Sequence, residues 1–364
     1  MTIGITVDHA NTKQRTGVGN VCFAIIQELK KQIPSTEKVV LYSAHSLIPE
    51  LADLPPNWQL KILRWPLGKL WTQLRLSGEF IFHPPDVFFA PGQLVPIICP
   101  KKTIAIIHDS AFLAVPEAYN FWGRQYLKWM NKLIINKSSK IITASEFNKS
   151  EIKKYYGGAA ADKTVVIPFA GVCLPLREGE KQRGSVGRII KPYILYIGRL
   201  ELKKNTANLI RAFNILKNKF DTQLVLVGIP GVGYAEIETE INNSPFKQDI
   251  ILLGFVQGEE LSSFLSDAEV FVFPSQYEGF GLPVLEAMAA GCPVVAADIP
   301  ALREVGGEAA IYSDGDTSAK LAESLARVIN NDQLSEQMRQ AGLARAQNFS
   351  WEKIVAQILT LLKL

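Results

Sequence analysis

The sequence predicts an α/β protein built from two Rossmann-like domains, each with a doubly wound parallel sheet. The first reason is the length of 364 residues, which exceeds what one ordinary hydrophobic core holds together. The second is that short β-branched runs alternate with segments of helical periodicity, which is typical of parallel sheets covered by helices on both faces. The third is the polar, aperiodic segment 173–192, which predicts a linker between two units.

The expected elements follow this alternation along the chain. In the first half, strands are predicted at 3–7, 39–42, 86–90, 103–107, 140–144 and 164–168, and helices at 18–31 and 121–136. In the second half, strands are predicted at 193–198, 222–228, 249–254, 269–274 and 292–297, and helices at 206–219 and 321–330. Such sheets bind ligands at the carboxyl ends of their strands, so two facing sheets would hold a ligand in the cleft between the domains.

The composition is that of a soluble globular protein, with 48% hydrophobic and 20% charged residues. No apolar run approaches the ~18 residues of a membrane-spanning helix, and the N-terminus lacks the basic and apolar regions of a signal peptide. The four cysteines, at 22, 99, 173 and 292, are scattered without CxxC pairing. This favours free thiols in a reducing cytoplasm.

Charge is distributed unevenly between the two halves. Residues 1–180 contain 21 Lys and Arg against 14 Asp and Glu, and residues 181–364 contain 18 against 21, so the halves carry +7 and −3. A basic first half favours an anionic partner, such as the inner membrane surface or a phosphorylated acceptor. An uneven scatter of surface lysines explains the asymmetry equally well.

The most informative stretch is SQYEGFGLPVLEAMAAGCPVV, residues 275–295, in which Glu278 and Glu286 flank a turn. A buried strand precedes the turn, and Pro283 suits the first turn of a short helix, where no N–H is needed. Gly279 and Gly281 let the backbone approach a ligand, and the free N–H groups of the new helix suit phosphate oxygens. The carboxylates would repel an anion and are better acceptors for hydroxyls on either side of a diphosphate, as in a nucleotide sugar. Two solvated glutamates on an ordinary strand–turn–helix are the alternative.

This stretch resembles the E-x7-E motif of the retaining glycosyltransferase family 4, whose members have the two-domain GT-B fold. The resemblance implies that Glu278 faces the donor sugar, that Glu286 holds the ribose, and that Phe280, Gly281 and Leu282 offer backbone donors near the phosphates. It also implies an acceptor-side domain at 1–180, a nucleotide-sugar-binding domain at 181–347, and a helix at 348–364 that crosses back to the N-terminal domain.

A second set of candidates lies in YILYIGRLELKKNTANLIRAF, residues 193–213. Arg199 follows the predicted strand and Lys204 precedes the next helix, and two cations in this place neutralise a leaving diphosphate without a metal ion. The segment resembles the family's GR…RKN pattern, which implies that Arg199 and Lys204 bind the diphosphate. Lys203 stands where many relatives have arginine. A helix start with solvated charges is the alternative.

Weaker candidates lie in the N-terminal half. Gly17 and Gly19 precede a helix and resemble the family's glycine loop, which closes over the donor phosphates, although Cys22 breaks the GxGxxG/A pattern. His108 follows a strand in a segment that resembles the family's HD stretch, which implies a position beside the reacting sugar, with Asp109 next to it on the acceptor side. A histidine that only occupies a turn is the alternative.

Two further segments also match the family. ITASEFNKSEI, residues 142–152, gives Ser145 and Glu146 on the acceptor side, with helix capping as the other role for Ser145. In LLGFVQGEEL, the backbone of Gly254, Phe255 and Val256 corresponds to the stretch that lies along the nucleotide base in relatives.

Two features are ambiguous. Asp314 and Asp316 form a DxD pair that resembles a metal clamp, but they directly precede a helix, so turn formation and capping explain them better and no metal site is predicted. Residues 61–76 combine four cations with two tryptophans. This pattern predicts a segment that contacts a membrane or an acceptor, or equally an ordinary helix packed by its tryptophans.

Together these features predict a metal-independent retaining glycosyltransferase with no cofactor, in which His108, Arg199, Lys204 and Glu278 form the catalytic group. The donor is expected to be GDP-mannose or a UDP-sugar, because the segments around His108 and Arg199 resemble mannosyltransferases of polysaccharide assembly. The expected acceptor is a saccharide or a lipid-linked saccharide, and nucleic acid is not an expected partner.

Other functions fit the same residues. A sugar-nucleotide epimerase or a hydrolase would use the same nucleotide site, and so would a non-catalytic nucleotide-sugar-binding protein; product analysis without acceptor separates the two enzymes from a transferase. A dinucleotide oxidoreductase fits least, because neither glycine cluster follows its strand as a Rossmann turn requires.

Overall fold

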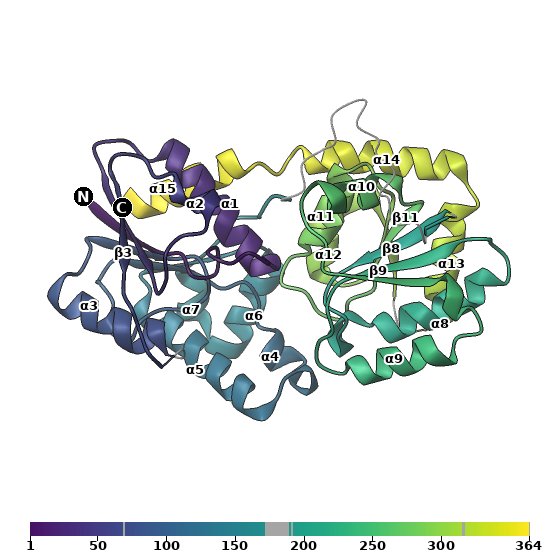
Figure 1. Ribbon diagram of the computed structural model, residues 1–364, viewed down its shortest axis with the longest axis horizontal. Coiled ribbons are helices and arrows are strands. Elements are labelled where there is room, and N and C mark those ends of the chain that lie inside the picture. The colour runs from purple at the N-terminus through teal and green to yellow at the C-terminus, as the bar shows by residue number, and fades with distance from the viewer. Residues whose placement is uncertain (68–69, 172–188, 191, 315–316, 364) are drawn as a thin grey trace. The chain divides into compact units, whose positions relative to one another are not determined.

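The structure is a computed structural model that describes residues 1–67, 70–171, 189–190, 192–314 and 317–363 (Figure 1). The chain forms two compact units. Unit 1 consists of Met1–Leu113, Phe121–Phe169 and Ser350–Leu364, and unit 2 consists of Ala114–Asn120 and Ala170–Phe349. Most of the predicted linker at 173–192 lies outside the described residues, as does the cysteine at 173. The cysteines at 22, 99 and 292 are free thiols.

Unit 1 is built around a parallel sheet because its strands are short, apolar and joined by helices. Within the described residues this sheet has seven strands in the order β3-β2-β1-β4-β5-β6-β7. The strands are Thr2–Thr6 (β1), Lys38–Ser43 (β2), Trp58–Ile62 (β3), Val87–Ala90 (β4), Thr103–Ile106 (β5), Lys140–Thr143 (β6) and Thr164–Val166 (β7). In register, Ile3 pairs with Val39 on one side and with Val87 on the other, so the strand order reverses between β1 and β4.

The helices of unit 1 run between these strands and include the last helix of the chain. They are Gly17–Gln32 (α1), Pro49–Ala52 (α2), Leu76–Phe82 (α3), Ala111–Ala114 (α4), Phe121–Lys137 (α5), Glu146–Tyr156 (α6), Gly158–Asp162 (α7) and Trp351–Lys363 (α15). A π-helical turn, Trp71–Arg75, leads directly into α3. Helix α15 packs beside α1, where the side-chain amide of Gln32 donates to the carbonyl oxygen of Glu352 at 3.0 Å (Figure 1).

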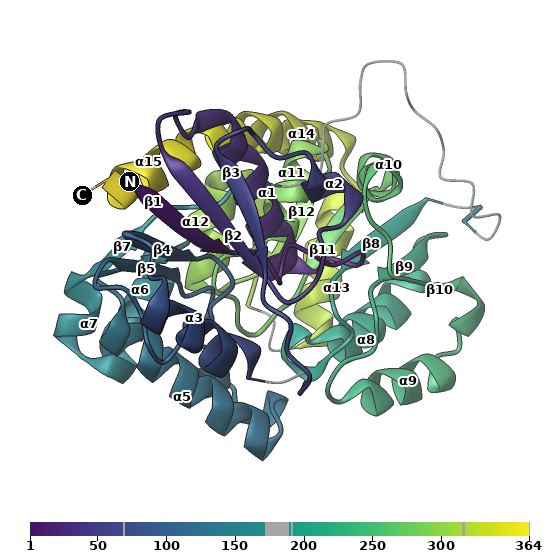
Figure 2. The same ribbon diagram turned by 60° about the vertical axis from the view of Figure 1, so that its left-hand side comes forward.

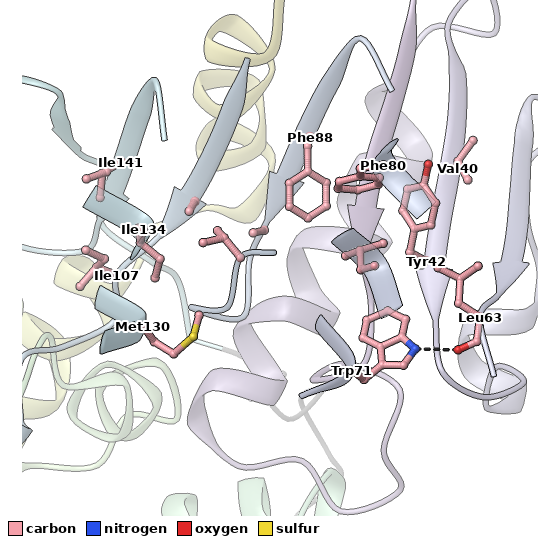
Figure 3. Close-up of a cluster of buried hydrophobic side chains, with 14 of the residues drawn as sticks. Val40, Tyr42, Leu63, Trp71, Phe80, Phe88, Ile107, Met130, Ile134 and Ile141 are labelled. Atoms are coloured by element: carbon pink, nitrogen blue, oxygen red, sulfur yellow. Dashed lines mark hydrogen bonds between the residues drawn. The ribbon is translucent and has the colours of Figure 1, made fainter. Parts of the chain in front are cut away.

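A buried cluster between the sheet of unit 1 and its helices joins distant parts of the sequence (Figure 3). The ring of Phe80 on α3 meets Tyr42 of β2 and Phe88 of β4 edge-on, with centroids 5.2 and 4.9 Å apart. The indole N–H of Trp71 donates to the carbonyl oxygen of Leu63 at 2.6 Å. Edge-to-face aromatic pairs of this kind add to the stabilisation from apolar burial. The cluster therefore fixes the segment around α3 to the sheet.

Unit 2 has a second parallel sheet, with six strands among the described residues in the order β10-β9-β8-β11-β12-β13. The strands are Tyr193–Ile197 (β8), Gln223–Val227 (β9), Ile250–Gly254 (β10), Val270–Phe273 (β11), Val294–Ala297 (β12) and Ala310–Ser313 (β13). The helices are Thr206–Lys217 (α8), Tyr234–Asn243 (α9), Glu259–Asp267 (α10), Leu282–Ala289 (α11), Pro300–Gly306 (α12), Ser318–Ile329 (α13) and Asp332–Ala346 (α14). Figure 2 shows this sheet with its helices from a second direction.

Short 3-10 turns complete unit 2. They are Pro116–Ala118, Leu202–Lys204, Lys247–Asp249 and Gly307–Ala309.

The strand order of the second sheet reverses between β8 and β11. Doubly wound sheets bind nucleotides at such a switch point.

The predicted α/β class with two parallel sheets is confirmed, and the predicted strands appear within two or three residues of their expected bounds. Two strands, β3 and β13, are not predicted. Both lie at a sheet edge and are only partly buried, so neither has the continuous apolar run of the central strands.

Candidate functional site

The switch point of the second sheet carries three of the charged residues that the sequence singles out. Arg199 and Lys204 follow β8, and Glu278 follows β11, which is the neighbouring strand. Because β8 and β11 are parallel, their carboxyl ends lie at the same edge of the sheet. Residues that are 74 or more positions apart in the sequence are thereby brought together.

Lys204 and Glu278 form an ion pair at this edge. The ammonium of Lys204 contacts Oε1 of Glu278, and both side chains are only 14% exposed. The same ammonium lies 5.1 Å from the ring centroid of Phe273, the last residue of β11, which is a favourable cation–π distance. The backbone N–H of Gln276 donates to the carbonyl oxygen of Lys203 at 2.9 Å, so the two loops are also joined through their backbones.

A second charge cluster lies on the same loop. Glu201 is 8% exposed, and its carboxylate lies 3.6 Å from the ammonium of Lys203 and 3.7 Å from Nε of Arg199. The ammonium of Lys203 also donates to the hydroxyl of Tyr119 at 3.3 Å. The side chain of Arg199 is 53% exposed, whereas Lys203 is held among partners. Of the cations on this loop, Arg199 therefore presents its charge most openly.

Close backbone contacts hold this edge together. The N–H of Gly228, after β9, donates to the carbonyl oxygen of Gly254 at 2.7 Å. A Cβ at position 228 would overlap the carbonyl oxygen of Gly198, after β8. Gly254 ends β10 with a φ of 72°, and the Phe255 side chain that follows is partly buried. The predicted base-contact stretch of Gly254, Phe255 and Val256 thus lies at the same edge as Lys204 but two strands away from β8.

The turn between the two glutamates is shaped by packing beneath it. Gly281 caps α11 with a φ of 117°, and a Cβ there would lie 2.5 Å from Cδ2 of Leu302. The ring of Phe280 is buried and meets Phe349 edge-on. These contacts with Leu302 and Phe349 hold the backbone of residues 279–282 in place, and α11 begins at Leu282.

Glu286 lies in the second turn of α11 and is only 7% exposed. A Cβ on Gly171 would lie 3.4 Å from its Cγ, so the backbone at 171 passes directly over this side chain. The two glutamates of the motif therefore differ in surroundings, since Glu278 is paired with Lys204 and Glu286 lies against backbone.

In unit 1, His108 follows β5 at the carboxyl edge of the first sheet. Its Nε2 lies 2.7 Å from the carbonyl oxygen of Pro91, and its backbone N–H donates to Oε1 of Gln93 at 2.9 Å. Burial lowers the pKa of His108 to about 4, and positive charge on nearby His9 adds to that effect. The imidazole is therefore neutral at pH 7, and because a carbonyl accepts at Nε2, the proton sits there and Nδ1 keeps its lone pair. Such a ring can accept a hydrogen bond from a hydroxyl.

The remaining predicted acceptor-side residues follow strands of the same sheet. Oδ1 of Asp109 accepts from the N–H of Ala111 at 3.1 Å. Ser145 is fully buried and caps α6, where its hydroxyl accepts from the N–H of Asn148 at 3.0 Å. Glu146 is exposed in the first turn of α6. The capping role that the sequence allowed for Ser145 is thus present, and an acceptor role for these residues stays a prediction.

The glycines near the N-terminus differ from expectation in one respect. Gly17 and Gly19 do not precede the helix but form its first turn, because α1 begins at Gly17 after Thr16. A Cβ at 19 would lie 2.9 Å from the carbonyl oxygen of His9. Glycine is therefore required at 19 for the approach of α1 to the loop after β1, a packing reason that the pattern alone does not reveal.

His9 is a residue that the sequence analysis missed. It follows β1 at the switch point of the first sheet, where burial lowers the pKa of its imidazole. A Cβ on Gly92, after the adjacent strand β4, would overlap its Nδ1. The polar pair at 8–9 could have indicated this residue from the sequence, because the pair directly follows the first apolar strand. Doubly wound sheets bind their ligands in this place.

The two ambiguous segments also have structural roles. Trp71 is buried in the core of unit 1 and Trp65 packs partly against it, which favours packing over contact with a partner for these two rings. The segment is no single helix, because Lys61 belongs to β3. Of the DxD pair, Asp314 contacts Lys320, and Asp316 lies outside the described residues. No cluster of three or more metal-ligating side chains occurs in the part of the chain that the structure describes.

Comparison with known proteins identifies similar sequences over most of the chain. Residues 180–345 match the model of the glycosyl transferases group 1. An O-antigen chain mannosyltransferase B from Escherichia coli is 29% identical over 314 residues, which cover 82% of this chain and 78% of that protein. An N-acetylgalactosamine-N,N'-diacetylbacillosaminyl-diphospho-undecaprenol 4-alpha-N-acetylgalactosaminyltransferase from Campylobacter jejuni is 27% identical over 308 residues, covering 82% and 81% of the two chains.

Solved structures share the fold. HepE from Anabaena, in complex with UDP-glucose, superposes with a TM-score of 0.76 over 100% of this chain and 99% of its own, at 19% identity. At this identity the likeness concerns the fold alone, and the predicted GT-B class is confirmed by it.

Proposed function

We propose that this chain, of which residues 180–345 match the glycosyl transferases group 1, is a glycosyltransferase that moves a hexose from a nucleoside-diphosphate sugar to a saccharide or lipid-linked saccharide. The observation that carries the proposal is the Lys204–Glu278 ion pair at the switch point of the second sheet, with Arg199 exposed on the same loop. A cation and a carboxylate side by side suit a ligand that presents phosphate oxygens next to sugar hydroxyls.

In the proposed complex each charged residue has one role. Arg199 and Lys204 bind the diphosphate and stabilise the negative charge that develops on it as the glycosidic bond breaks. Glu278 accepts hydrogen bonds from the sugar hydroxyls, and Glu286 accepts them from the ribose. Since two protein cations meet the leaving group, the proposed reaction needs no metal ion.

The unit 1 residues complete the proposal. Neutral His108 accepts a hydrogen bond from a hydroxyl of the transferred sugar, which its pKa of about 4 supports. Gly17 and Gly19 contact the donor phosphates, and Asp109 and Glu146 bind the acceptor. These assignments rest on the resemblance to the family and on the position of each residue at a strand end or helix start.

Mannose is the proposed sugar and GDP-mannose the proposed donor, because an O-antigen chain mannosyltransferase is among the similar proteins. A lipid-linked acceptor is supported by the Campylobacter relative, whose name specifies a diphospho-undecaprenol saccharide. The UDP-glucose bound to HepE keeps a UDP-sugar as the second candidate donor.

A thermal-shift panel tests the donor. A sugar nucleotide at about 100 times its Kd stabilises the protein by about 2.7 kcal/mol, which should raise Tm by about 5 °C. GDP-mannose and GDP should both produce this shift, and GDP-glucose or UDP should produce less. Guanosine and free mannose, which lack the diphosphate, serve as controls. No shift with any nucleoside diphosphate or sugar nucleotide would contradict the proposed donor site.

The proposed retaining mechanism is same-face attack assisted by the leaving phosphate, because a Glu278 that holds sugar hydroxyls and contacts Lys204 is poorly placed to attack the anomeric carbon. Glu278→Gln should keep donor binding and lower kcat by about 10²-fold without abolishing transfer, since the amide still accepts a hydrogen bond. Glu236→Gln, which alters an exposed carboxylate paired with Arg211, is the matched control and should change nothing.

Mass spectrometry of the wild-type protein with a slow donor analogue decides between the mechanisms. Complete loss of transfer in Glu278→Gln, together with a glycosyl adduct on Glu278 of the wild type, would show a covalent intermediate and contradict same-face attack.

A further inference from the structure

Helix α5 of unit 1 exposes two tryptophans, Trp122 and Trp129, whose ring contacts are with the neighbouring Phe121 and Tyr126 of the same helix. Trp122 is 79% and Trp129 is 41% exposed, and the preceding Phe121 is also exposed. The two indoles are seven residues apart and therefore lie on one side of the helix. The buried side chains of α5, which include Met130 and Ile134, lie on the other side. The exposed rings thus contribute little to the core of unit 1.

The charges on α5 have one sign. The helix carries four basic residues, Arg124, Lys128, Lys132 and Lys137, and no Asp or Glu. Arg124 donates to a backbone carbonyl oxygen of Phe112, whereas Lys132 and Lys137 are exposed. Lysines on the polar side of an aromatic helix are the pattern of a helix that lies on an anionic bilayer.

A second set of exposed apolar side chains belongs to the segment that packs against the buried side of α5. Leu74 of the π-helical turn and Ile81 and Phe82 of α3 are exposed, with Phe82 at 76%. They lie at positions i, i+7 and i+8, which is one face of a helix. The amide of Gln73 lies 3.3 Å from the sulfur of Met130, so this turn packs on α5, and both ribbon views place α3 next to α5 (Figures 1 and 2).

Acidic charge is also masked at this second surface. Glu79 of α3 is 7% exposed and contacts Lys61, lies 3.7 Å from Arg75, and pairs with His83 at 3.1 Å. Its carboxylate is therefore turned inward and neutralised. An anionic surface brought to this side meets lysines, arginines and apolar side chains rather than an exposed acid from α3 or α5.

We propose that α5, through Phe121, Trp122, Trp129, Lys128 and Lys132, docks unit 1 on an anionic phospholipid bilayer, and that Leu74, Ile81 and Phe82 extend this contact. We call the five α5 residues the aromatic–basic face. Indole rings settle at the headgroup level of a bilayer, and lysines near the surface are attracted to anionic lipids. Large exposed apolar patches on a soluble unit mark an interaction surface, and the excess of positive charge selects an anionic one.

This inference deepens the proposed function and rests on it for the acceptor, because a lipid-linked saccharide is held at a bilayer. It moves the membrane contact from the two tryptophans of residues 61–76, which pack inward, to α5 and α3, and from residues 61–76 it keeps Leu74. Among the described residues, no helix is long and apolar enough to cross a membrane. The proposed contact is therefore one of surface docking.

Cosedimentation with vesicles tests the inference without any substrate, so its outcome is independent of the proposed transfer reaction. The wild-type chain should sediment with vesicles of phosphatidylcholine and phosphatidylglycerol, and much less with phosphatidylcholine alone. Trp122→Ser/Lys132→Glu should weaken the partition coefficient at least about 30-fold, because reversing one lysine removes two units of favourable charge and an interfacial ring is lost as well. Raising the salt to about 0.5 M should weaken wild-type binding.

A matched variant in unit 2 controls for general surface effects. Ile215→Ser/Lys219→Glu changes one exposed apolar side chain on α8 and one exposed lysine just after it, and so makes the same kinds of change as Trp122→Ser/Lys132→Glu. This control should bind vesicles like the wild type. Equal weakening in both variants, or equal binding to vesicles with and without phosphatidylglycerol, would overturn the proposal.

Sedimentation velocity separates the bilayer from a second copy of the chain. If the wild type ignores vesicles but self-associates, and Trp122→Ser/Lys132→Glu abolishes that association, then the aromatic–basic face is an interface between copies and the bilayer proposal is wrong. Binding to anionic vesicles by a wild type that stays monomeric supports it.

Discussion

Lys204→Met should lower kcat/KM for sugar transfer by about 10²- to 10³-fold, whereas Lys203→Met should change it by less than about threefold. The reason is position, since Lys204 contacts Glu278 at the switch point, while Lys203 is occupied by Glu201 and Tyr119. Removing one cation that stabilises a leaving group typically has an effect of this size. Methionine keeps an unbranched apolar side chain of similar length and removes the ammonium group with its charge and its hydrogen-bond donors.

The measurement is initial-rate kinetics with the donor that thermal shift identifies, for both variants and the wild type. The two lysines are adjacent in sequence and lie on the same 3-10 turn, so general damage to this loop would affect both variants. Thermal shift with the nucleoside diphosphate should also disappear in Lys204→Met and persist in Lys203→Met. An equal loss of activity in the two variants would contradict the assignment of Lys204 as the diphosphate ligand.

Gly228→Ala should destabilise unit 2 by at least about 4 kcal/mol, which is exceptional for a single methyl group. A Cβ at this position would overlap the carbonyl oxygen of Gly198, and the φ of 153° is itself unfavourable for alanine. Both neighbours are backbone and are held by the sheet, so no flexible side chain can move aside. The loops after β8 and β9 would have to separate.

Gly258→Ala is the matched control, because Gly258 has a φ of 67° and nothing within 4 Å of a Cβ. Its ψ of −142° lies in a region that residues other than glycine rarely adopt, so this variant should lose about 1 to 3 kcal/mol from backbone strain alone. Urea unfolding followed by circular dichroism measures both variants. A loss in Gly228→Ala no larger than in Gly258→Ala would show that backbone conformation, rather than the contact with Gly198, decides the requirement for glycine.

Much of the fold was predictable because central parallel strands are buried on both faces and appear in the sequence as continuous apolar runs. β8 and β11 are of this kind, and the candidate residues at 199, 204 and 278 were found because they lie in the loops that follow such runs. The edge strands β3 and β13 were missed for the converse reason, since a half-exposed strand carries polar residues and resembles a loop.

The parts that the sequence could not predict depend on contacts between distant positions. The pairing of Lys204 with Glu278 requires β8 and β11 to be neighbours, a fact of strand order rather than of either motif. The contact of His9 with Gly92 similarly depends on the pairing of β1 with β4. Local patterns identify which side chains are chemically suited to a ligand, and the topology decides which of them meet.

The assignment of Ala114–Asn120 to unit 2 and of Ser350–Leu364 to unit 1 means that the chain passes from one unit to the other after Leu113, Asn120, Phe169 and Phe349. The two halves are therefore interlaced rather than strung in series. A recombination event that exchanged the gene at the segment 173–192 would give the new N-terminal half a foreign closing helix against α1. It would also bring a foreign partner to Ala114–Asn120. Donor specificity should therefore be exchanged between relatives by crossovers that keep Ala114–Asn120 with unit 2 and Ser350–Leu364 with unit 1. Sugar preference would then be inherited together with the packing contacts inside each unit.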